Sequence, residues 1–128
     1  MTIEDMESFT NNLWDWKFLD DCFQGTKIKV SDLDGIVERK GQFLVIECKS
    51  PSTKVKSGQK IMFETMAKTG LFTVIVVWGE RNKPERMKII RRNKNGELLE
   101  KEYERITEKQ LHQAVSEWYE KVNNSTLS

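Results

Sequence analysis

A long apolar run in the second half of the chain restricts its fold most strongly. Residues 71–78 (Leu-Phe-Thr-Val-Ile-Val-Val-Trp) are rich in β-branched and aromatic side chains and include no charged residue. A strand of that composition is buried on both faces, as strands are when helices cover both sides of a sheet. The run therefore predicts a buried strand in a layered α/β fold.

The other hydrophobic patterns predict the elements around this strand. A helix is expected over residues 3–14, with Thr2 and Asp5 as its cap pair. Further segments are a short helix or turn at 14–23, strands at 27–30, 34–39 and 43–48, a helix at 59–69, a hairpin of 86–91 and 97–101, and a helix at 107–122. This order predicts an α/β fold, a mixed β-sheet flanked by helices, in one domain over residues 1–128.

Composition narrows the kinds of site that the chain can hold. It has two cysteines, Cys22 and Cys48, and one histidine, His112. We therefore expect no disulfide framework and a reducing, cytoplasmic environment. The same count leaves too few ligands for a zinc finger, a two-histidine metalloprotease helix or a histidine-rich nuclease centre. No apolar run approaches the ~18 residues that span a bilayer, so we expect no membrane partner.

The charge of the chain is unevenly distributed. A net charge of +1 argues against a dedicated nucleic-acid-binding protein. Residues 81–94, however, carry seven basic side chains and only one acidic one. Such a segment could lie along a phosphate backbone or could be a solvated basic hairpin, and the sequence leaves both interpretations open.

Acidic residues and a lysine gather between residues 32 and 49. The tripeptide acid-x-Lys occurs at 15–17, 38–40 and 47–49, so the pattern by itself carries little information. Only Glu47 follows a four-residue apolar run, and only it has carboxylates, Asp32 and Asp34, placed across a plausible hairpin. Because side chains alternate along a strand, Glu47 and Lys49 share one face.

Carboxylates that converge at a strand end repel one another unless a proton or a cation neutralises them. Hard oxygen ligands favour Mg²⁺ or Mn²⁺, and a lysine beside such a metal can align water or stabilise a phosphorane-like transition state. The pattern therefore indicates either a metal site that acts on a phosphodiester or a strand-end Glu–Lys pair with solvated aspartates.

The same residues resemble the core of the PD-(D/E)XK nuclease superfamily. Asp34 lies thirteen residues before Glu47, and Lys49 follows two residues later. The helix that opens at 57–63 and the strand after Gly70 resemble the VRR-NUC-like and Holliday-junction-resolvase branch, over roughly residues 27–80. The chain is also similar to small nuclease-like proteins of bacteriophages. The resemblance implies a restriction-endonuclease-like fold and a metal-dependent DNA endonuclease, with junctions and flaps among its implied substrates.

The resemblance also assigns roles to individual residues. It implies Asp34, Glu47 and the backbone carbonyl of Cys48 as ligands of Mg²⁺ (or Mn²⁺), Lys49 as the catalytic lysine and Gln59 as a helper. The name-giving proline is replaced by Leu33, which leaves open whether Asp32 is a further ligand. An acid on the N-terminal helix often assists in these nucleases, and Glu7 or Glu4 would fill that role. Charge and position along the chain, rather than the resemblance, give the expected DNA contacts: Lys54, Lys56, Lys60, Arg81, Arg91 and Arg92.

The expected partner is DNA. One chain offers one site, so cutting both strands of a junction would take a homodimer. The near-neutral net charge also fits a subunit that needs a protein partner for substrate recognition. The alternative to an enzyme is a non-catalytic nucleic-acid-binding module that keeps the nuclease fold. If the chain is phage-encoded, its expected location is the host cytoplasm.

Overall fold

The chain forms two compact units in the computed structural model, which describes residues 2–11 and 13–125 without the side chains of 8–11. The boundary between the units falls between Asp32 and Leu33. The single domain expected over residues 1–128 stays a prediction. Within the described ranges, no helix is long and apolar enough to cross a membrane.

The N-terminal unit holds helix α1 (Ile3–Asn11) and a 3₁₀ helix, η1 (Lys17–Phe23). The predicted cap pair is confirmed, since the Thr2 hydroxyl accepts from the Asp5 backbone N–H at 3.1 Å and also donates to the Asp5 carboxylate at 2.7 Å. The strand predicted at 27–30 is wrong, because these residues join no ladder. Instead, the Thr26 hydroxyl donates to the Phe23 carbonyl and accepts from the Ile28 N–H, a local bonding pattern that competes with strand formation.

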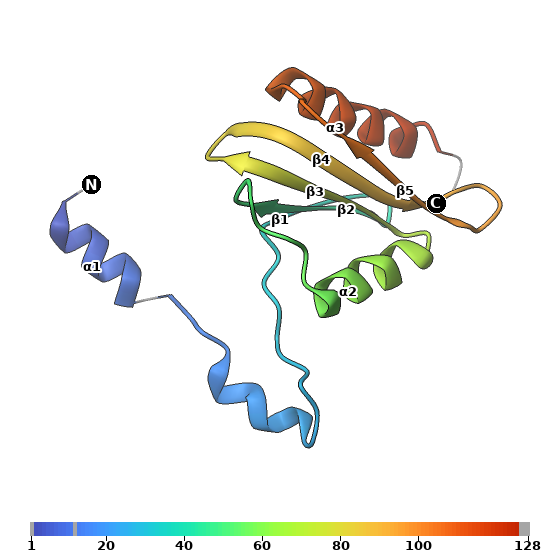
Figure 1. Cartoon of the computed structure of the whole chain (residues 1–128). Coiled ribbons are helices and arrows are strands. Elements are labelled where there is room, and N and C mark those ends of the chain that lie inside the picture. Colours follow the sequence, from blue (N-terminus) through green and yellow to red (C-terminus); the bar gives the residue numbers. More distant parts are fainter. Residues whose placement is uncertain (1, 12, 126–128) are drawn as a thin grey trace. The chain divides into compact units, whose positions relative to one another are not determined.

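The C-terminal unit is a five-stranded mixed sheet between two helices. Its strands are β1 (Gly35–Arg39), β2 (Gln42–Lys49), β3 (Phe72–Glu80), β4 (Lys83–Arg92) and β5 (Leu98–Tyr103), in that order across the sheet. Strands β2 and β3 are parallel, and all other neighbours are antiparallel. Helices α2 (Ser57–Lys68) and α3 (Glu108–Asn123) cover opposite faces (Figure 1). The α/β prediction of a mixed sheet flanked by helices is confirmed, and the arrangement is compatible with a restriction-endonuclease-like fold.

Local chemistry sets where the elements begin and end. The β1–β2 turn uses left-handed backbone at Lys40 and Gly41 (φ 52° and 78°), and the Gly41 N–H donates to the Glu38 carboxylate at 2.9 Å. The chain after α2 turns at Gly70, with φ 78°, a conformation that glycine adopts without strain. Thr107 caps α3 in a capping box with Gln110, as the position of this threonine predicts.

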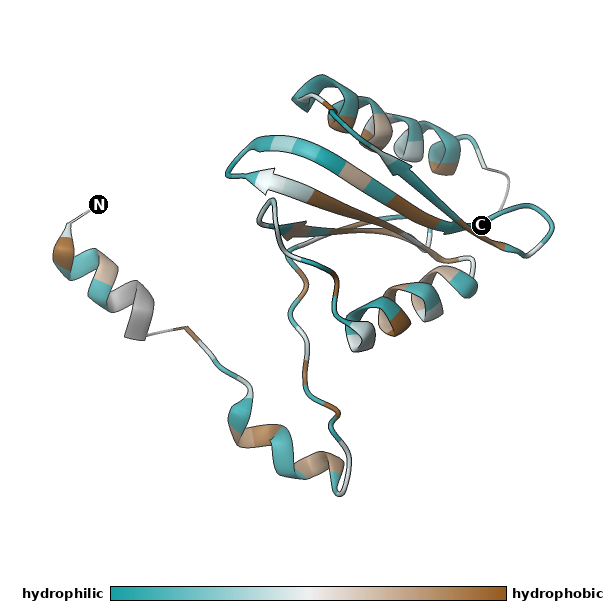
Figure 2. Cartoon of the chain, in the orientation of Figure 1, coloured by the Kyte–Doolittle hydropathy of each residue, from teal (hydrophilic) through white to brown (hydrophobic). Residues whose placement is uncertain are grey.

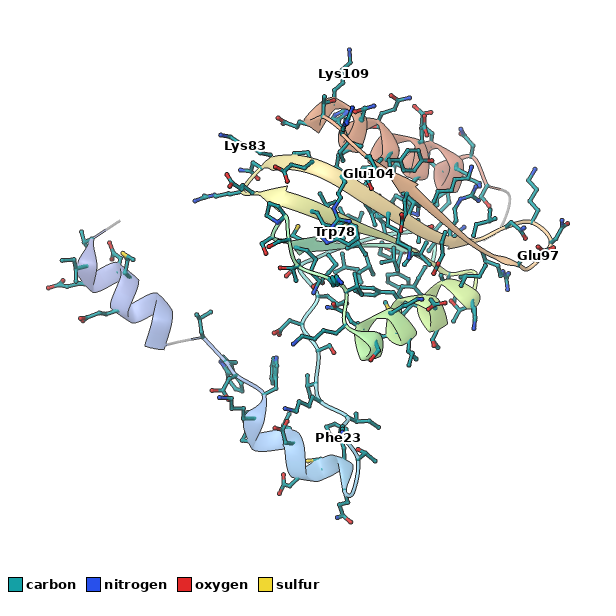
Figure 3. All side chains as sticks on the ribbon, in the orientation of Figure 1. Phe23, Trp78, Lys83, Glu97, Glu104 and Lys109 are labelled. Atoms are coloured by element: carbon teal, nitrogen blue, oxygen red, sulfur yellow. The ribbon has the colours of Figure 1, made fainter. Side chains whose placement is uncertain are left out.

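Two hydrophobic layers lie on the two faces of the sheet. Residues 74–78 of β3 are buried, which confirms the strand predicted to be buried on both faces. Figure 2 shows the apolar colouring concentrated along β3, and Figure 3 shows the side chains that pack on both sides of it. The α2 layer contains Val45, Phe63, Ala67, Val74, Val76, Trp78 and Ile90. The α3 layer contains Leu44, Ile75, Val77, Met87, Ile106, Trp118 and Val122.

Removal of the α3 cap tests how far local chemistry stabilises this unit. Thr107→Ala is expected to lower the free energy of unfolding by about 1 kcal/mol, because the Gln110 N–H loses its side-chain acceptor. Urea unfolding followed by circular dichroism measures the change. Thr65→Ala, at an exposed interior position of α2, is the control, since alanine is the better helix former there. An equal loss of unfolding free energy in the two variants would contradict the role of Thr107 as a stabilising cap.

Candidate active site

The end of β2 brings an acid and a lysine to the face of the sheet that α2 covers. The parallel register pairs Glu47 with Val76 and Lys49 with Trp78, in line with the apolar residues of the α2 layer. The antiparallel register of β1 and β2 ends with Gly35 opposite Ile46, and one further step sets Asp34 opposite Glu47. The sheet thus juxtaposes the two carboxylates that the sequence predicted as ligands.

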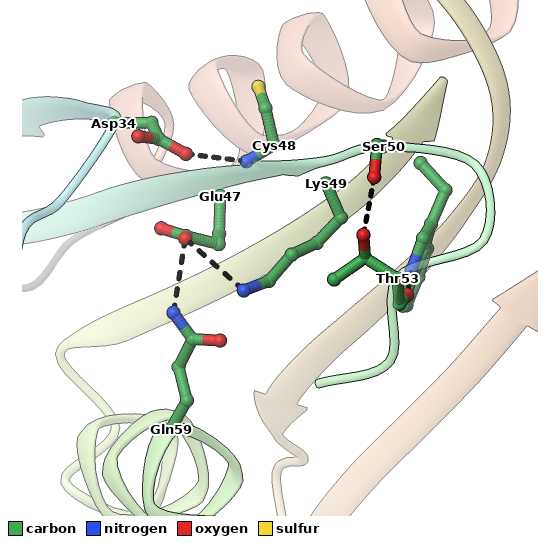
Figure 4. Close-up of polar contacts among 8 residues, drawn as sticks. Asp34, Glu47, Cys48, Lys49, Ser50, Thr53 and Gln59 are labelled. Atoms are coloured by element: carbon green, nitrogen blue, oxygen red, sulfur yellow. Dashed lines mark hydrogen bonds and ion pairs between the residues drawn. The ribbon is translucent and has the colours of Figure 1, made fainter. Parts of the chain in front are cut away.

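Asp34 is fixed by the backbone of β2. Its Oδ2 accepts a hydrogen bond from the backbone N–H of Cys48 at 2.8 Å, and the side chain is exposed (Figure 4). This bond continues the ladder beyond β1, with a side-chain oxygen in place of a carbonyl.

Glu47 is buried, with only 6% of its surface exposed. Its Oε1 accepts from the Gln59 side-chain amide at 3.1 Å and lies 3.8 Å from Nζ of Lys49 (Figure 4). Its Oε2 is buried and, over residues 2–11 and 13–125, has no hydrogen-bond partner. A buried carboxylate oxygen without a donor is costly, so this oxygen is the strongest indication of a missing ligand.

Burial raises the pKa of Glu47 above its ordinary value, and the negative charge of Asp34 raises it further. The ammonium of Lys49 and the hydrogen bond from Gln59 act in the opposite direction and do not cancel the rise. The raised pKa means that the site favours added positive charge, either a proton or a cation, between the carboxylates.

The loop after β2 is held by two residues of the neighbouring strands. The indole N–H of Trp78 donates to the Thr53 carbonyl at 2.6 Å. The guanidinium of Arg86 lies 3.9 Å from the centre of the Trp78 ring and donates to the Pro51 carbonyl at 3.4 Å. The hydroxyls of Ser50 and Thr53 share a short hydrogen bond across the same turn (Figure 4). These contacts fix the chain that connects Lys49 to α2.

The sequence interpretation did not identify Trp78 or Arg86 as site residues. Trp78 belongs to the apolar run of β3 and resembles a core residue, and Arg86 is one of many basic residues in the segment 81–94. Their role depends on the β3–β4 register, which places the two residues opposite each other. No pattern along the chain carries that information.

The predicted DNA contacts lie in separate places on the C-terminal unit. Three lysines are exposed close to Gln59, in the loop before α2 and in the first turn of that helix: Lys54, Lys56 and Lys60. Arg81 is exposed at the β3–β4 turn. Arg91 is half-buried against the α3 layer, and Arg92 donates to the Lys68 carbonyl at 3.3 Å. Only the three lysines accompany the candidate site.

The remaining predicted acids belong to the N-terminal unit. Asp32 accepts a hydrogen bond from the indole N–H of Trp16 at 2.7 Å. Glu4 and Glu7 are exposed on α1. Their participation in the site stays a prediction.

The donor set fits a small, hard cation. In the part of the chain that the structure describes, no three His, Cys, Asp or Glu side chains form a group that could hold a metal ion. The site supplies two carboxylates, and the Cys48 carbonyl is the predicted third protein ligand. Mg²⁺ is often bound by one or two carboxylates and keeps several waters, so this small set is compatible with it. The partnerless Oε2 of Glu47 supplies a direct reason for a cation there.

Comparison of the chain with models of protein families, with curated proteins and with solved structures finds no match.

The raised pKa of Glu47 gives the site a measurable pH dependence. Between the ordinary pKa of 4.5 and the raised value, the folded protein binds more protons than the unfolded chain. The wild type therefore loses stability as the pH rises through that interval. Glu47→Gln removes the titration, so its free energy of unfolding should rise relative to wild type above about pH 4.5 and show no such gain below about pH 4.

Urea unfolding in EDTA at a series of pH values measures this difference. Glu104→Gln, at an exposed position after β5, controls for the loss of one carboxylate. Parallel curves of unfolding free energy against pH for wild type and Glu47→Gln would contradict the raised pKa of Glu47.

Proposed function

We propose that the protein is a metal-dependent DNA endonuclease that hydrolyses phosphodiester bonds. The observation that carries this proposal is the buried Glu47 carboxylate, which has one partnerless oxygen and lies beside Asp34 and Lys49. A structural Glu–Lys pair would need no second carboxylate opposite it and no buried oxygen without a donor. The arrangement matches the residue roles that the PD-(D/E)XK resemblance implies.

Asp34, Glu47 and the Cys48 carbonyl would hold Mg²⁺ or Mn²⁺. When bound, such a cation lowers the pKa of water and offsets negative charge on a phosphate. Gln59 keeps the Glu47 carboxylate in one orientation, because its amide donates to Oε1 and leaves Oε2 directed elsewhere.

Lys49 is the one ammonium that contacts Glu47 in the described part of the chain, at 3.8 Å. Its charge would orient the attacking water and stabilise the negative charge that develops on the phosphate oxygens. The water oxygen forms the new P–O bond while the bond to the 3′ oxygen breaks, and the 3′ oxygen takes up a proton. The products are a 5′-phosphate and a 3′-hydroxyl.

Lys54, Lys56 and Lys60 would contact the DNA backbone around the cleaved bond. All three are exposed, and Lys56 and Lys60 flank the N-terminus of α2, where backbone N–H groups also favour anions. Since these contacts are electrostatic, DNA affinity should decrease steeply with salt. Action on both strands of a junction would use a homodimer or a partner protein.

Metal binding can be tested separately from cleavage. Mg²⁺ or Mn²⁺ at about a hundred times its Kd should stabilise the wild type by about 2.7 kcal/mol, measured as thermal denaturation with and without EDTA. Asp34→Asn and Glu47→Gln should lose most of this gain, because each removes a charged ligand. Glu104→Gln should keep it. Equal stabilisation of all three variants would contradict the assigned ligands.

Cleavage tests the proposed function itself. End-labelled duplex, single-stranded, flap and four-way-junction DNA is incubated with protein and Mg²⁺, Mn²⁺ or EDTA. Lys49→Ala should lower the rate on the preferred substrate at least about a hundredfold, while metal-induced stabilisation stays. Lys101→Ala, at an exposed position of β5, should cut as wild type does.

Metal-dependent stabilisation without cleavage of any substrate would contradict the endonuclease and favour the binding module or partner-dependent subunit. Cleavage that persists in Lys49→Ala would contradict the role given to this lysine.

A further inference from the structure

A second candidate site lies on the opposite face of the sheet. A cavity of about 360 Å³ opens between α3 and the beginnings of β2 and β3, where Gln42 and Phe72 line it. The candidate active site is at the other end of β2, under α2, so the two sites share no residue. The volume lies in the range of small-molecule pockets.

One wall of this cavity is apolar. It is formed by Ile75 of β3, Ile89 of β4 and the indole of Trp118 on α3. These side chains belong to the α3 layer of the core, and Trp118 is almost fully buried. A flat ring could pack against this surface and gain the hydrophobic and aromatic contacts of a core residue.

The other wall carries positive charge that forms no ion pair with the acidic side chains that the structure describes. Three cationic residues, Arg91, Arg92 and Lys121, line the cavity, and Glu117 is the one acid of its described lining. Over the residues that the structure describes, neither Arg91 nor Lys121 forms an ion pair. Partial desolvation and the charges of Arg91 and Lys94 lower the pKa of Lys121, so these cations repel one another.

The single acid does not balance this charge. The Glu117 carboxylate accepts a hydrogen bond from the Gln113 side chain at 3.0 Å and, among the described residues, forms no ion pair with the cations. The Arg92 guanidinium is engaged elsewhere, since it donates to the Lys68 carbonyl at the end of α2. Arg91 and Lys121 are therefore the cations available to a ligand.

We propose that this pocket binds a phosphate monoester with a flat apolar body, of the nucleoside monophosphate class. Phosphate suits the site because it is close to a dianion at neutral pH and can accept from the Arg91 fork and the Lys121 ammonium together. The ring of the ligand would pack on Trp118 and Ile89. This inference goes beyond the proposed nuclease function and does not depend on it.

Titration of the ¹⁵N-labelled full chain followed by NMR tests the proposal, with adenosine monophosphate, thymidine monophosphate, adenosine and inorganic phosphate as probes. The monophosphates should shift the Trp118 indole N–H signal in a saturable way. Adenosine and inorganic phosphate should each bind at least about tenfold more weakly, because each lacks one half of the ligand. Equal affinity for adenosine or for inorganic phosphate would overturn the proposal, as would the absence of saturable binding by either monophosphate.

Substitutions of the cationic side chains test which of them bind the phosphate. Arg91→Gln and Lys121→Gln should each weaken binding of the monophosphate about tenfold or more. Lys109→Gln is the matched control, since this lysine lies at the beginning of α3, projects away from the sheet in Figure 3 and does not line the cavity. Glu117→Gln should tighten binding about threefold, because it removes the one acid of the described lining.

The amide spectrum of each variant reports whether it is folded. If Arg91→Gln does not fold, Lys121→Gln decides, because Lys121 is an exposed position of α3. Unchanged affinity in folded Lys121→Gln, or an equal loss in Lys109→Gln, would overturn the assigned site.

Discussion

The parallel pairing of β2 with β3 is the constraint on which the rest of the C-terminal unit depends. Two consecutive parallel strands need a crossover, and α2 supplies it across one face of the sheet. Because β3 is apolar on both faces, the opposite face needs a cover as well, which α3 provides. The crossover returns the chain past the end of β2, and for this reason Gln59, in the first turn of α2, meets the side chain of Glu47.

Glu47 occupies a position where an aliphatic side chain would be more stable. Its neighbours along and across the strands are Val45 and Val76, both fully buried. A glutamate there loses hydration and recovers only the contacts of one oxygen, with Gln59 and Lys49. Buried acids with perturbed pKa values and incomplete bonding concentrate at functional sites. The cost in stability is therefore an argument for function, and a cation bound between Asp34 and Glu47, as proposed, would remove much of this cost.

The sequence predicted those parts of the fold and site that local patterns determine. The buried strand was predictable from its composition, and the last helix from its capping threonine. The outer hairpin was predictable from the turn that joins its strands. The pairing of Asp34 with Glu47 was predictable as well, since a tight turn at Lys40-Gly41 sets the β1–β2 register. The strand predicted at 27–30 was wrong, because β-branched residues form a strand only where a partner ladder exists. The Trp78–Arg86 contact and the basic pocket each join residues from different elements, and only the assembled sheet places them together.

The sheet separates the acidic candidate active site, on the α2 face, from the basic cavity on the α3 face. Adjacent residues of one strand point to opposite faces, so β4 contributes Ile90 to the α2 layer and Arg91 to the cavity beneath α3. A substitution can therefore change one face with little effect on the chemistry of the other. Between the faces lie the buried residues 74–78 of β3, none of which has a titratable side chain. The proposed cation site and the proposed anion pocket share no residue, so ligands of the two sites would not compete for the same side chains.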